Sequence, residues 1–517
     1  MRPMTVAFPP PTISEARFAK PPAWHPLWIA FGLTALATAL RLSGTVDSDV
    51  AWQLWIAGRL HAGANLYRDI IETNPPLWFW MAVPIDRLAV VLQLRVEAVL
   101  AIVIGLVSAA SLAATNRLIR HVPAMRRALL LAVGALALTV IPWVHLGQRE
   151  QLVLIGTVPY CALIAARRSG DAVPPWLALV VGAGAAAGFA LKHYFLAVPI
   201  LLELWLVIGL GRRWQPIRSE TLAIAAAGLV YAAALLLFER DFLTAIVPLV
   251  RLAYGDFGAP AIKYMFGPFA VAGLAALLAV AAHARLLWGG RSPFAAALFV
   301  AGIGFAAIYF IQFKGWPYHA IPMIGCGCLA LAALLTESET PPRAAFLTAP
   351  ALLALPLVLA FEEQRHPALP NPDLRQAIAG LKPGDAVGFL ATETAIPWSV
   401  TLQGGYTYAS RYNGFWMMHA ILRNERRGSP DQRLTDLGRR IVTETIADFT
   451  CTPPRRIIVS RPRPGEDSFD ILPFFLRDPG FGALLSHYRA TSRTSLEVYE
   501  LSVPIPAPPR GCRRVDL

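Results

Sequence analysis

Two aspartates, Asp47 and Asp49, stand just after the first strongly apolar run of the sequence, with one residue between them. A carboxylate near a membrane surface can serve as a general base, and two carboxylates together can bind a divalent cation. Asp49 also precedes a helical pattern, so capping that helix is its structural alternative. Capping leaves Asp47 unexplained. The pair predicts acid–base chemistry, with Asp49 as the first choice for the base and Asp47 as the second.

Basic residues occur in the short turns between later apolar runs, far along the chain from these acids. They are Arg149, which is followed by Glu150, and Lys192, Lys314 and His319. A charge held at mid-membrane costs about 2.5–3.5 kcal/mol, so these side chains should face polar partners. The alternative is that each one is an interface anchor that reaches water. Together they predict a binding site for an anionic phosphate.

The composition indicates what kind of scaffold positions these residues. Of the 517 residues, 56% are hydrophobic and 15% are charged, whereas soluble proteins carry about 25% charged residues. Runs that can cross a hydrocarbon core of about 30 Å occur about eleven times. They lie near residues 26–42, 95–115, 126–146, 150–166, 175–191, 193–211, 219–238, 265–284, 294–312, 318–336 and 344–361. The sequence therefore predicts an all-α polytopic membrane protein.

The charges between these runs predict the orientation of the chain. A further apolar stretch at 76–92 contains Pro84, Asp86 and Arg87, and we predict that it is a juxtamembrane or re-entrant helix that does not cross. The arginine clusters in the loops then share one side with the N-terminus, as the positive-inside rule requires. The N-terminus is therefore predicted to be cytoplasmic, and the residues after 361 to lie on the outer face.

Charges and prolines return after residue 361, and the pattern of the sequence changes. Short β-like runs at 386–392, 456–460 and 495–501 alternate with helical patterns near 415–424 and 432–448. This alternation predicts a small C-terminal α/β domain outside the membrane. The predicted domains are a cytoplasmic N-terminal segment at 1–25, a transmembrane domain at 26–361 with a first outer loop and its juxtamembrane helices at 43–94, and a periplasmic α/β domain at 362–517.

Two features of the C-terminal region bear on its role. The segment from Trp398 to Trp416 is rich in aromatic side chains and contains Arg411. Such side chains can stack on sugar rings and bind phosphate, or they can form the core of the domain. Cys451 and Cys512 could form one disulfide if the region faces an oxidising compartment.

The first outer loop carries the most informative combination of motifs. An acid follows the first apolar run, an amphipathic helix expected to lie in the membrane interface extends from Val50 to Leu60, and YRD at 67–69 precedes NPPL at 74–77. This loop resembles the first outer loop of the GT-C glycosyltransferases, in particular the protein-mannosyltransferase and lipid A aminoarabinose-transferase branch. In that family the loop acid is catalytic or orients the acceptor, and an acidic-Lys-Pro-Pro motif helps to hold the lipid-phosphate donor. Here Asn74 stands where that lysine is expected.

The resemblance implies a reaction and a set of roles. A sugar carried on a polyprenyl phosphate in the lipid bilayer would move to the hydroxyl of a glycan, lipid or protein acceptor on the outer face of a bacterial inner membrane. The implied catalytic residues are Asp49 and Asp47, the donor-phosphate residues are Lys192, Lys314, Arg149 and His319, and the substrate-binding residues are Glu72, Arg68, Glu150 and Tyr318. No cofactor is expected, and a divalent metal held by the two aspartates is the alternative.

Two other classes of function fit part of the sequence. The net charge of +13 is compatible with nucleic-acid binding, but the basic residues fall in short clusters between apolar runs, so no nucleic-acid partner is predicted. A transporter or flippase of lipid-linked or anionic solutes is the alternative function, because it would use the same membrane cations. A transporter would also need buried charge toward the cytoplasm, whereas the sequence places nearly all charge that is not in loops on the outer side. A glycosyltransferase is therefore the leading prediction.

Overall fold

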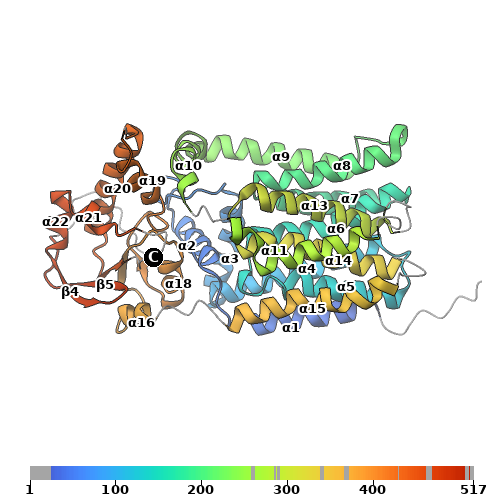
Figure 1. Cartoon of the computed structure of the whole chain (residues 1–517), viewed down its shortest axis with the longest axis horizontal. Helices are drawn as coiled ribbons and strands as arrows, with labels where there is room; N and C mark the ends of the chain where they lie inside the picture. Colours follow the sequence, from blue (N-terminus) through green and yellow to red (C-terminus); the bar gives the residue numbers. More distant parts are fainter. Residues whose placement is uncertain are drawn as a thin grey trace, which may run out of the picture.

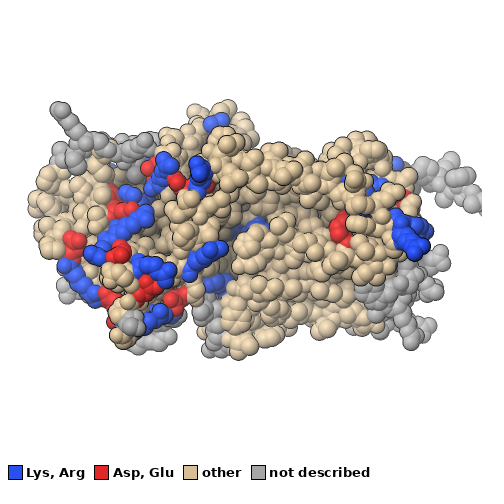
Figure 2. All heavy atoms as spheres, turned by 90° about the horizontal axis from the view of Figure 1, so that it is seen from above, with Lys and Arg blue, Asp and Glu red and all other residues tan. Residues whose placement is uncertain are grey.

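The computed structural model of this protein describes residues 25–257, 262–283, 287, 292–337, 343–365, 372–428, 430–461, 469–506 and 512. An elongated helical bundle is followed, at one end of its long axis, by a smaller domain that contains the strands (Figure 1). Charged side chains gather over that domain and at the opposite end of the bundle, and most of the surface between them is uncharged on the face shown (Figure 2). The predicted cytoplasmic segment 1–25 lies outside the described residues except for His25.

Each apolar run that the sequence predicted as a span contains a helix. Long apolar runs form helices in lipid because a helix satisfies every backbone hydrogen bond within its own segment. The helices are α1 (Leu27–Arg41), α4 (Val96–Leu118), α5 (Ala124–Thr139), α6 (Arg149–Ser169), α7 (Pro175–Phe189), α8 (Ala197–Leu210), α9 (Ser219–Phe238), α11 (Pro268–Ala281), α13 (Pro293–Gln312), α14 (Ile321–Glu337) and α15 (Arg343–Arg365), with the short α10 (Val247–Ala253) after α9. Helix α14 is central, since 94% of its apolar window is buried, whereas α9 is peripheral, with 0% buried.

Six helical segments among the described residues are long and apolar enough to cross a membrane. They are Val96–Leu118, Arg149–Ser169, His193–Arg213, Ser219–Phe238, Pro293–Gln312 and Pro317–Glu337. Three more helices, α1, α7 and α11, are apolar but have only 15, 15 and 14 residues. A helix of that length covers about 22 Å, which is less than a hydrocarbon core of about 30 Å. The helical membrane class is therefore confirmed, but the predicted number of about eleven spans is not.

Two further helices, α2 (Ser48–His61) and α3 (Leu77–Leu92), come from the predicted first outer loop. Pro84 lies inside α3 without ending it. The acidic charge within this apolar stretch has a partner, because Asp86 Oδ2 lies 2.7 Å from Nδ1 of His61 at the end of α2. This contact links α2 to α3 and gives the Asp86 carboxylate a polar partner.

The C-terminal domain contains a mixed five-stranded sheet in the order β2-β1-β3-β5-β4, so the α/β prediction is confirmed. Strand β1 pairs in parallel with β2 and β3, and β5 pairs antiparallel with β3 and β4. The strands are β1 (Ala386–Leu390), β2 (Thr407–Tyr408), β3 (Arg456–Ser460), β4 (Tyr488–Arg493) and β5 (Leu496–Leu501), and the helices are α16 (Pro372–Ile378), α17 (Ala395–Trp398), α18 (Thr401–Gly404), α19 (Met418–Glu425), α20 (Gln432–Cys451), α21 (Leu472–Phe475) and α22 (Pro479–Leu485). Strands β2 and β4 were not predicted, because one has two residues and the other is a polar edge strand.

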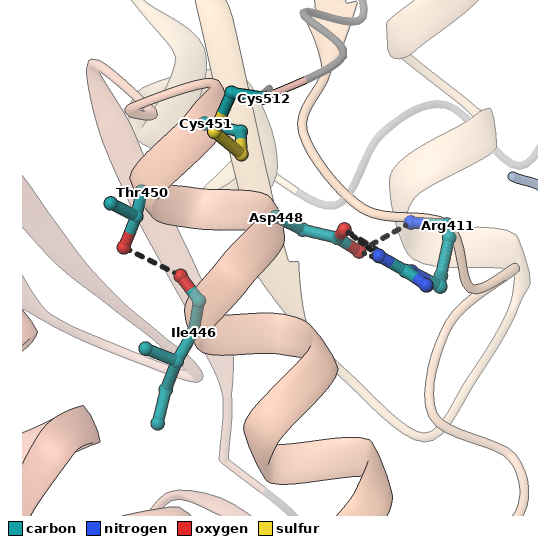
Figure 3. The surroundings of a disulfide bond; sticks show 6 residues. All are labelled: Arg411, Ile446, Asp448, Thr450, Cys451 and Cys512. Atoms are coloured by element: carbon teal, nitrogen blue, oxygen red, sulfur yellow. Dashed lines mark hydrogen bonds and ion pairs between the residues drawn. A yellow bond between two sulfur atoms is a disulfide. The ribbon is translucent and has the colours of Figure 1, made fainter. Parts of the chain in front are cut away.

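A disulfide and an ion pair fix the C-terminal end of helix α20 (Figure 3). A disulfide joins Cys451 to Cys512, with the Cα atoms 5.5 Å apart. Three residues before Cys451, the Asp448 carboxylate accepts hydrogen bonds from the backbone N–H of Arg411 at 3.0 Å and from its Nη2 at 2.7 Å. Arg411, which the sequence offered as a phosphate ligand, therefore fastens its loop to α20. The disulfide that the sequence left open is formed.

Helix α2 is enclosed between the bundle and the C-terminal domain. All residues from Val50 to Ala57 are buried. The ring of Trp398, in α17, lies 4.7 Å from that of Trp52 and 5.3 Å from that of Trp55. The sequence pattern predicted a helix with one side open to water, but α2 is buried within the protein, and the domain packs on Trp52 and Trp55. The aromatic segment of the C-terminal domain is mainly core, and it holds the helix that carries Asp49.

Candidate active site

Asp47, and not Asp49, is the N-cap of α2. Its Oδ1 accepts a hydrogen bond from the backbone N–H of Val50 at 2.9 Å. Its Oδ2 is 2.8 Å from Nδ1 of His145 and accepts from Nε2 of Gln148 at 2.9 Å. Capping was the structural alternative for Asp49, and the structure gives the cap to Asp47 because the helix begins at Ser48, one residue after it. Both oxygens of Asp47 are thus engaged by the protein, and the Asp47 side chain fixes the start of α2 against the turn before α6.

Asp49 lies in the first turn of α2 and is held by one hydrogen bond. The hydroxyl of Tyr318 donates to Asp49 Oδ2 at 2.9 Å. The other oxygen of Asp49 accepts no hydrogen bond within the part of the chain that is described, and the residue keeps part of its surface open. Burial raises the pKa of the Asp49 carboxyl above its usual range, and the Asp47 charge raises it further, whereas Arg149 and Tyr318 lower it. Of the two acids, Asp49 is therefore the one that can accept a proton from a substrate.

A cluster of charged residues lies where α6 begins, within electrostatic reach of Asp49. Glu150, at 1% exposure, accepts a hydrogen bond from Lys192 Nζ at 2.6 Å. Nε2 of His319 lies 3.4 Å from Lys192 Nζ and 3.6 Å from Glu150 Oε1. Residues that are far apart in the sequence, from the starts of α6, η2 (His193–Leu196) and η7 (Pro317–Ala320), thus meet at one point.

Arg149 is the least satisfied member of this cluster. It is 4% exposed, yet its Nε and Nη1 have no hydrogen-bond partner in the described structure. Nδ1 of His319 and Oε2 of Glu150 are also without partners there. A buried cation without a partner is destabilising by several kcal/mol, of order 3–5 when a pair is broken, and the positive end of the α6 dipole adds to the local charge. This arrangement is suited to an anion that binds from outside the chain.

His145 links Asp47, at the start of α2, to helix α15. Besides its contact with Asp47, its Nε2 lies 3.2 Å from Oε1 of Glu363 in α15. Burial alone lowers the pKa of His145, but the hydrogen bonds to Asp47 and Glu363 raise it to about 9. The imidazole is therefore a cation at neutral pH and offsets the charge of Asp47. Sequence reasoning missed both His145 and Glu363; the polar residues around 145–148, between two apolar runs, were the available signal for His145.

Lys314 lies at the edge of the cluster. Its Nζ donates to the backbone carbonyl of Phe257 at 2.5 Å and lies 4.4 Å from the ring centre of Tyr254. Its loop reaches the cluster through Trp316, whose ring lies 5.2 Å from that of His319. An ammonium has three donors, so Lys314 keeps donors beyond the one used for Phe257.

Glu72 and Arg68, both predicted to bind substrate, have other partners. Glu72 is buried and accepts hydrogen bonds from Trp52 Nε1 and from Nδ2 of Asn74, the latter at 2.6 Å. Asn74, at the position of the expected lysine, thus holds Glu72 in the loop. Arg68 is exposed and pairs with Asp241, away from the buried cluster. Both residues shape the first outer loop, and Arg68 is not brought to the site.

The structure thus gathers most of the predicted site residues. The set that comes together is Asp49, Asp47, Arg149, Glu150, Lys192, Tyr318 and His319, with Lys314 and Glu72 beside it. Among the described residues there is no group of three His, Cys, Asp or Glu side chains arranged to hold a metal.

A second charged cluster lies at the other end of the bundle. Nε and Nη2 of Arg167 each donate to the Glu220 carboxylate at 3.0 Å, and Arg218 Nε donates to it at 2.8 Å. Arg218 also pairs with Glu203. The cluster borders a cavity of about 440 Å³. Its arginines pair with Glu220 and Glu203, so the cluster joins the ends of α6 and α9 to the middle of α8.

Comparisons with known proteins give structural similarities only. No family model and no curated protein sequence matches the chain. ArnT from Cupriavidus metallidurans bound to undecaprenyl phosphate is 14% identical, with 94% of this chain and 98% of that chain covered and a TM-score of 0.48. AglB, an oligosaccharyltransferase from Archaeoglobus fulgidus in complex with an inhibitory peptide and a dolichol-phosphate, is 10% identical, with 93% and 74% covered and a TM-score of 0.45. Arabinofuranosyltransferase AftD from Mycobacteria is 14% identical, with 93% and 42% covered and a TM-score of 0.47.

All three proteins are GT-C glycosyltransferases, the superfamily that the first outer loop of this chain resembles. Their identities are 14% or less and their TM-scores are below 0.5, so they assign no donor, acceptor or site residue to this chain. Those assignments depend on the side chains described above.

Proposed function

We propose that this protein is a glycosyltransferase that moves a sugar from a polyprenyl-phosphate donor to an acceptor hydroxyl, at the end of the bundle beside the C-terminal domain. One observation carries the proposal. Within the described structure, the Asp49 carboxylate has an oxygen without a donor, and the buried Arg149 guanidinium nearby has nitrogens without an acceptor. An acceptor hydroxyl fits the first group, and a phosphate fits the second.

In the proposed reaction, the acceptor oxygen forms a bond to the anomeric carbon of the sugar while the bond from that carbon to the phosphate oxygen breaks. The hydroxyl proton passes to Asp49, and the electron pair of the broken bond leaves on the polyprenyl phosphate. A positioned general base contributes about 10²- to 10⁴-fold to such a step. The raised pKa of Asp49 suits this role, because a more basic carboxylate takes the proton more readily once it is ionised.

The cations are proposed to stabilise the leaving phosphate. Negative charge grows on the phosphate as the glycosidic bond breaks, so cations at that point stabilise the transition state more than the ground state. The planar fork of Arg149 matches two phosphate oxygens. Lys192 adds a point charge, and its hydrogen bond to Glu150 both holds the lysine and balances that carboxylate. His319 has a free Nδ1 that can bind the sugar or the phosphate.

Asp47 and His145 are proposed to support the base and not to replace it. The His145 imidazolium, with a pKa of about 9, offsets the Asp47 charge at neutral pH. Without that offset, a second bare carboxylate would stand two residues from Asp49 and would repel the phosphate. Asp47 also fixes the first turn of α2, which sets the direction of the Asp49 side chain.

The site is proposed to face the periplasm of a bacterial inner membrane, with the N-terminus in the cytoplasm and a glycan, lipid or protein as the acceptor. The Cys451–Cys512 disulfide supports this orientation, because such bonds persist in oxidising compartments. Thiol labelling of native protein from cells tests it. The remaining cysteines are buried, so we expect no labelling before reduction and two labelled thiols after it. Two free thiols before reduction would place the domain in the cytoplasm.

The proposed reaction is tested in proteoliposomes with the full-length protein. A panel of undecaprenyl-phosphate-linked sugars and candidate acceptors is supplied, and mass spectrometry follows sugar transfer and the release of undecaprenyl phosphate. We expect each transferred sugar to release one carrier lipid. Movement of the intact lipid-linked sugar between leaflets, with no release of the carrier, would establish the flippase alternative and overturn the proposal.

A further inference from the structure

The C-terminal domain contacts a short segment of the bundle that follows α10. This segment comprises η5 (Tyr254–Asp256) and Phe257. The ring of Trp416 lies 5.6 Å from that of Tyr254 and 5.9 Å from that of Phe257. Nη1 of Arg423, in α19, donates to the backbone carbonyl of Asp256 at 2.9 Å. Stacking and a charge-assisted hydrogen bond thus fix the segment to the domain.

The same segment also holds Lys314. Its ammonium donates to the Phe257 carbonyl and lies over the Tyr254 ring. The ring of Trp316, two residues further on, lies 6.4 Å from that of Phe257. Lys314 is therefore held by the two residues on which Trp416 packs. If the segment moves, the ammonium loses both its hydrogen bond and its aromatic partner.

The loop that carries Lys314 continues directly into the candidate active site. The ring of Trp316 lies 5.7 Å from that of Tyr318 and 5.2 Å from that of His319. Tyr318 in turn donates to Asp49. A chain of contacts therefore runs from the C-terminal domain through Phe257 and Trp316 to the residues that face the proposed substrates.

We infer that the C-terminal domain is a positioning part of the donor-phosphate site: Trp416 and Arg423 hold the segment from Tyr254 to Phe257, which fixes Lys314 where it can bind the donor phosphate. This inference rests on the proposed function. It gives the domain a role in donor binding, whereas a domain that only seats the acceptor would leave donor binding unchanged.

Binding of undecaprenyl phosphate to the full-length protein in nanodiscs tests the inference without knowledge of the sugar. We expect Lys314→Ala to weaken binding about tenfold, the size of one charge-assisted hydrogen bond. Trp416→Ala should weaken undecaprenyl phosphate binding about fivefold. The double variant should weaken binding about tenfold and not fiftyfold, because both changes remove the same interaction. Arg423→Gln should act in the same direction as Trp416→Ala.

Matched controls separate positioning from a general loss of folding. Phe481→Leu removes a buried aromatic ring that packs on Phe475 in the same domain, far along the chain from this contact. Arg440→Gln removes an arginine that pairs with Glu444 on α20. Both controls should leave undecaprenyl phosphate binding unchanged, and Trp416→Phe should restore most of it. In transfer assays, Trp416→Ala should raise KM for the donor more than it lowers kcat.

The outcomes distinguish this inference from the proposed function. One outcome overturns the inference: Lys314→Ala weakens binding, but Trp416→Ala leaves it unchanged, as the control does. The inference is also overturned if the effects of Lys314→Ala and Trp416→Ala multiply in the double variant. In both cases the proposed function stands. If neither Lys314→Ala nor Arg149→Gln changes undecaprenyl phosphate binding, the proposed phosphate site itself fails, and the inference fails with it.

Discussion

Helix α6 carries an arginine near each end, the buried Arg149 and the partly exposed Arg167, and the two differ in their partners. Arg149 and Arg167 are 18 positions apart in the helix, which corresponds to about 27 Å, close to the thickness of a hydrocarbon core. Arg167 donates twice to Glu220, which also accepts from Arg218. Arg149 has two nitrogens without partners in the described structure. The same residue type in the same helix thus holds elements of the fold together at one end and, in the proposed function, binds the donor phosphate at the other.

This comparison corrects one expectation from the sequence. Nearly all charge outside the loops was expected on the outer side, but the buried Glu220 and its two partly buried arginines form a cluster at the opposite end. Position alone therefore does not separate a glycosyltransferase from a transporter. The two clusters differ instead in pairing, because Arg167 and Arg218 have carboxylate partners within the protein and Arg149 has nitrogens without a partner in the described structure.

The largest expected effect is at the proposed base. Asp49→Asn should lower the rate of sugar transfer about 10²- to 10⁴-fold, because the amide cannot accept the hydroxyl proton. Binding of undecaprenyl phosphate should change little. Asp69→Asn is the matched control in the same loop, where Asp69 accepts hydrogen bonds from Asn65. Steady-state kinetics of both variants checks this, and full activity of Asp49→Asn would remove the proposed base.

The next effect concerns the paired cluster. Glu220→Gln leaves the partly buried Arg167 without its counter-charge and leaves Arg218 with Glu203 alone, so we expect a loss of about 3 kcal/mol of stability. Thermal unfolding measures it, and transfer should persist below the new Tm. Glu425→Gln, which removes a largely exposed partner of Arg477, should cost about 0–1 kcal/mol. Loss of transfer without loss of stability in Glu220→Gln would make this cluster functional.

A smaller effect is expected from the pH dependence of His145. Its pKa rises from 6.5 to about 9 in the folded protein, so the charged contact with Asp47 and Glu363 stabilises fully below pH 6.5. The contribution is lost progressively as pH rises to about 9, because the folded state then holds a proton that the unfolded state lacks. Tm measured from pH 6 to 10 should therefore fall through this window in the wild type and be flatter in His145→Gln. Equal slopes in the two proteins would contradict the assignment.

The sequence predicted the members of the site better than their partners. Arg149, Lys192 and His319 could be found because a charge between closely spaced apolar runs must be buried or at an interface. Glu363 could not be found, since an acid after the last apolar run is ordinary, and its contact with His145 depends on how α15 packs. The alternative that Asp49 caps α2 was one helical position off, because helix starts are uncertain by one or two residues in a sequence pattern.

The sequence predicted the types of secondary structure well and the contacts between distant segments less well. Long apolar runs predicted the helices of the bundle, and short β-like runs predicted strands β1, β3 and β5. The burial of α2 was missed, because it depends in part on Trp398, which packs on Trp52 and Trp55 from more than 300 residues further along the chain. Arg68 was predicted to bind substrate, but its turn faces outward to Asp241. Long-range packing of this kind leaves no local signal in the sequence.

The most direct test compares Arg149→Gln with Arg167→Gln, by undecaprenyl phosphate binding and by Tm in the same nanodiscs. Arg149→Gln should weaken binding about tenfold or more with Tm unchanged or higher, because it removes an unpaired buried charge. Arg167→Gln should lower Tm and leave binding unchanged. If Arg149→Gln instead lowers Tm and keeps binding, while Arg167→Gln loses binding, the unpaired cluster is not the phosphate site.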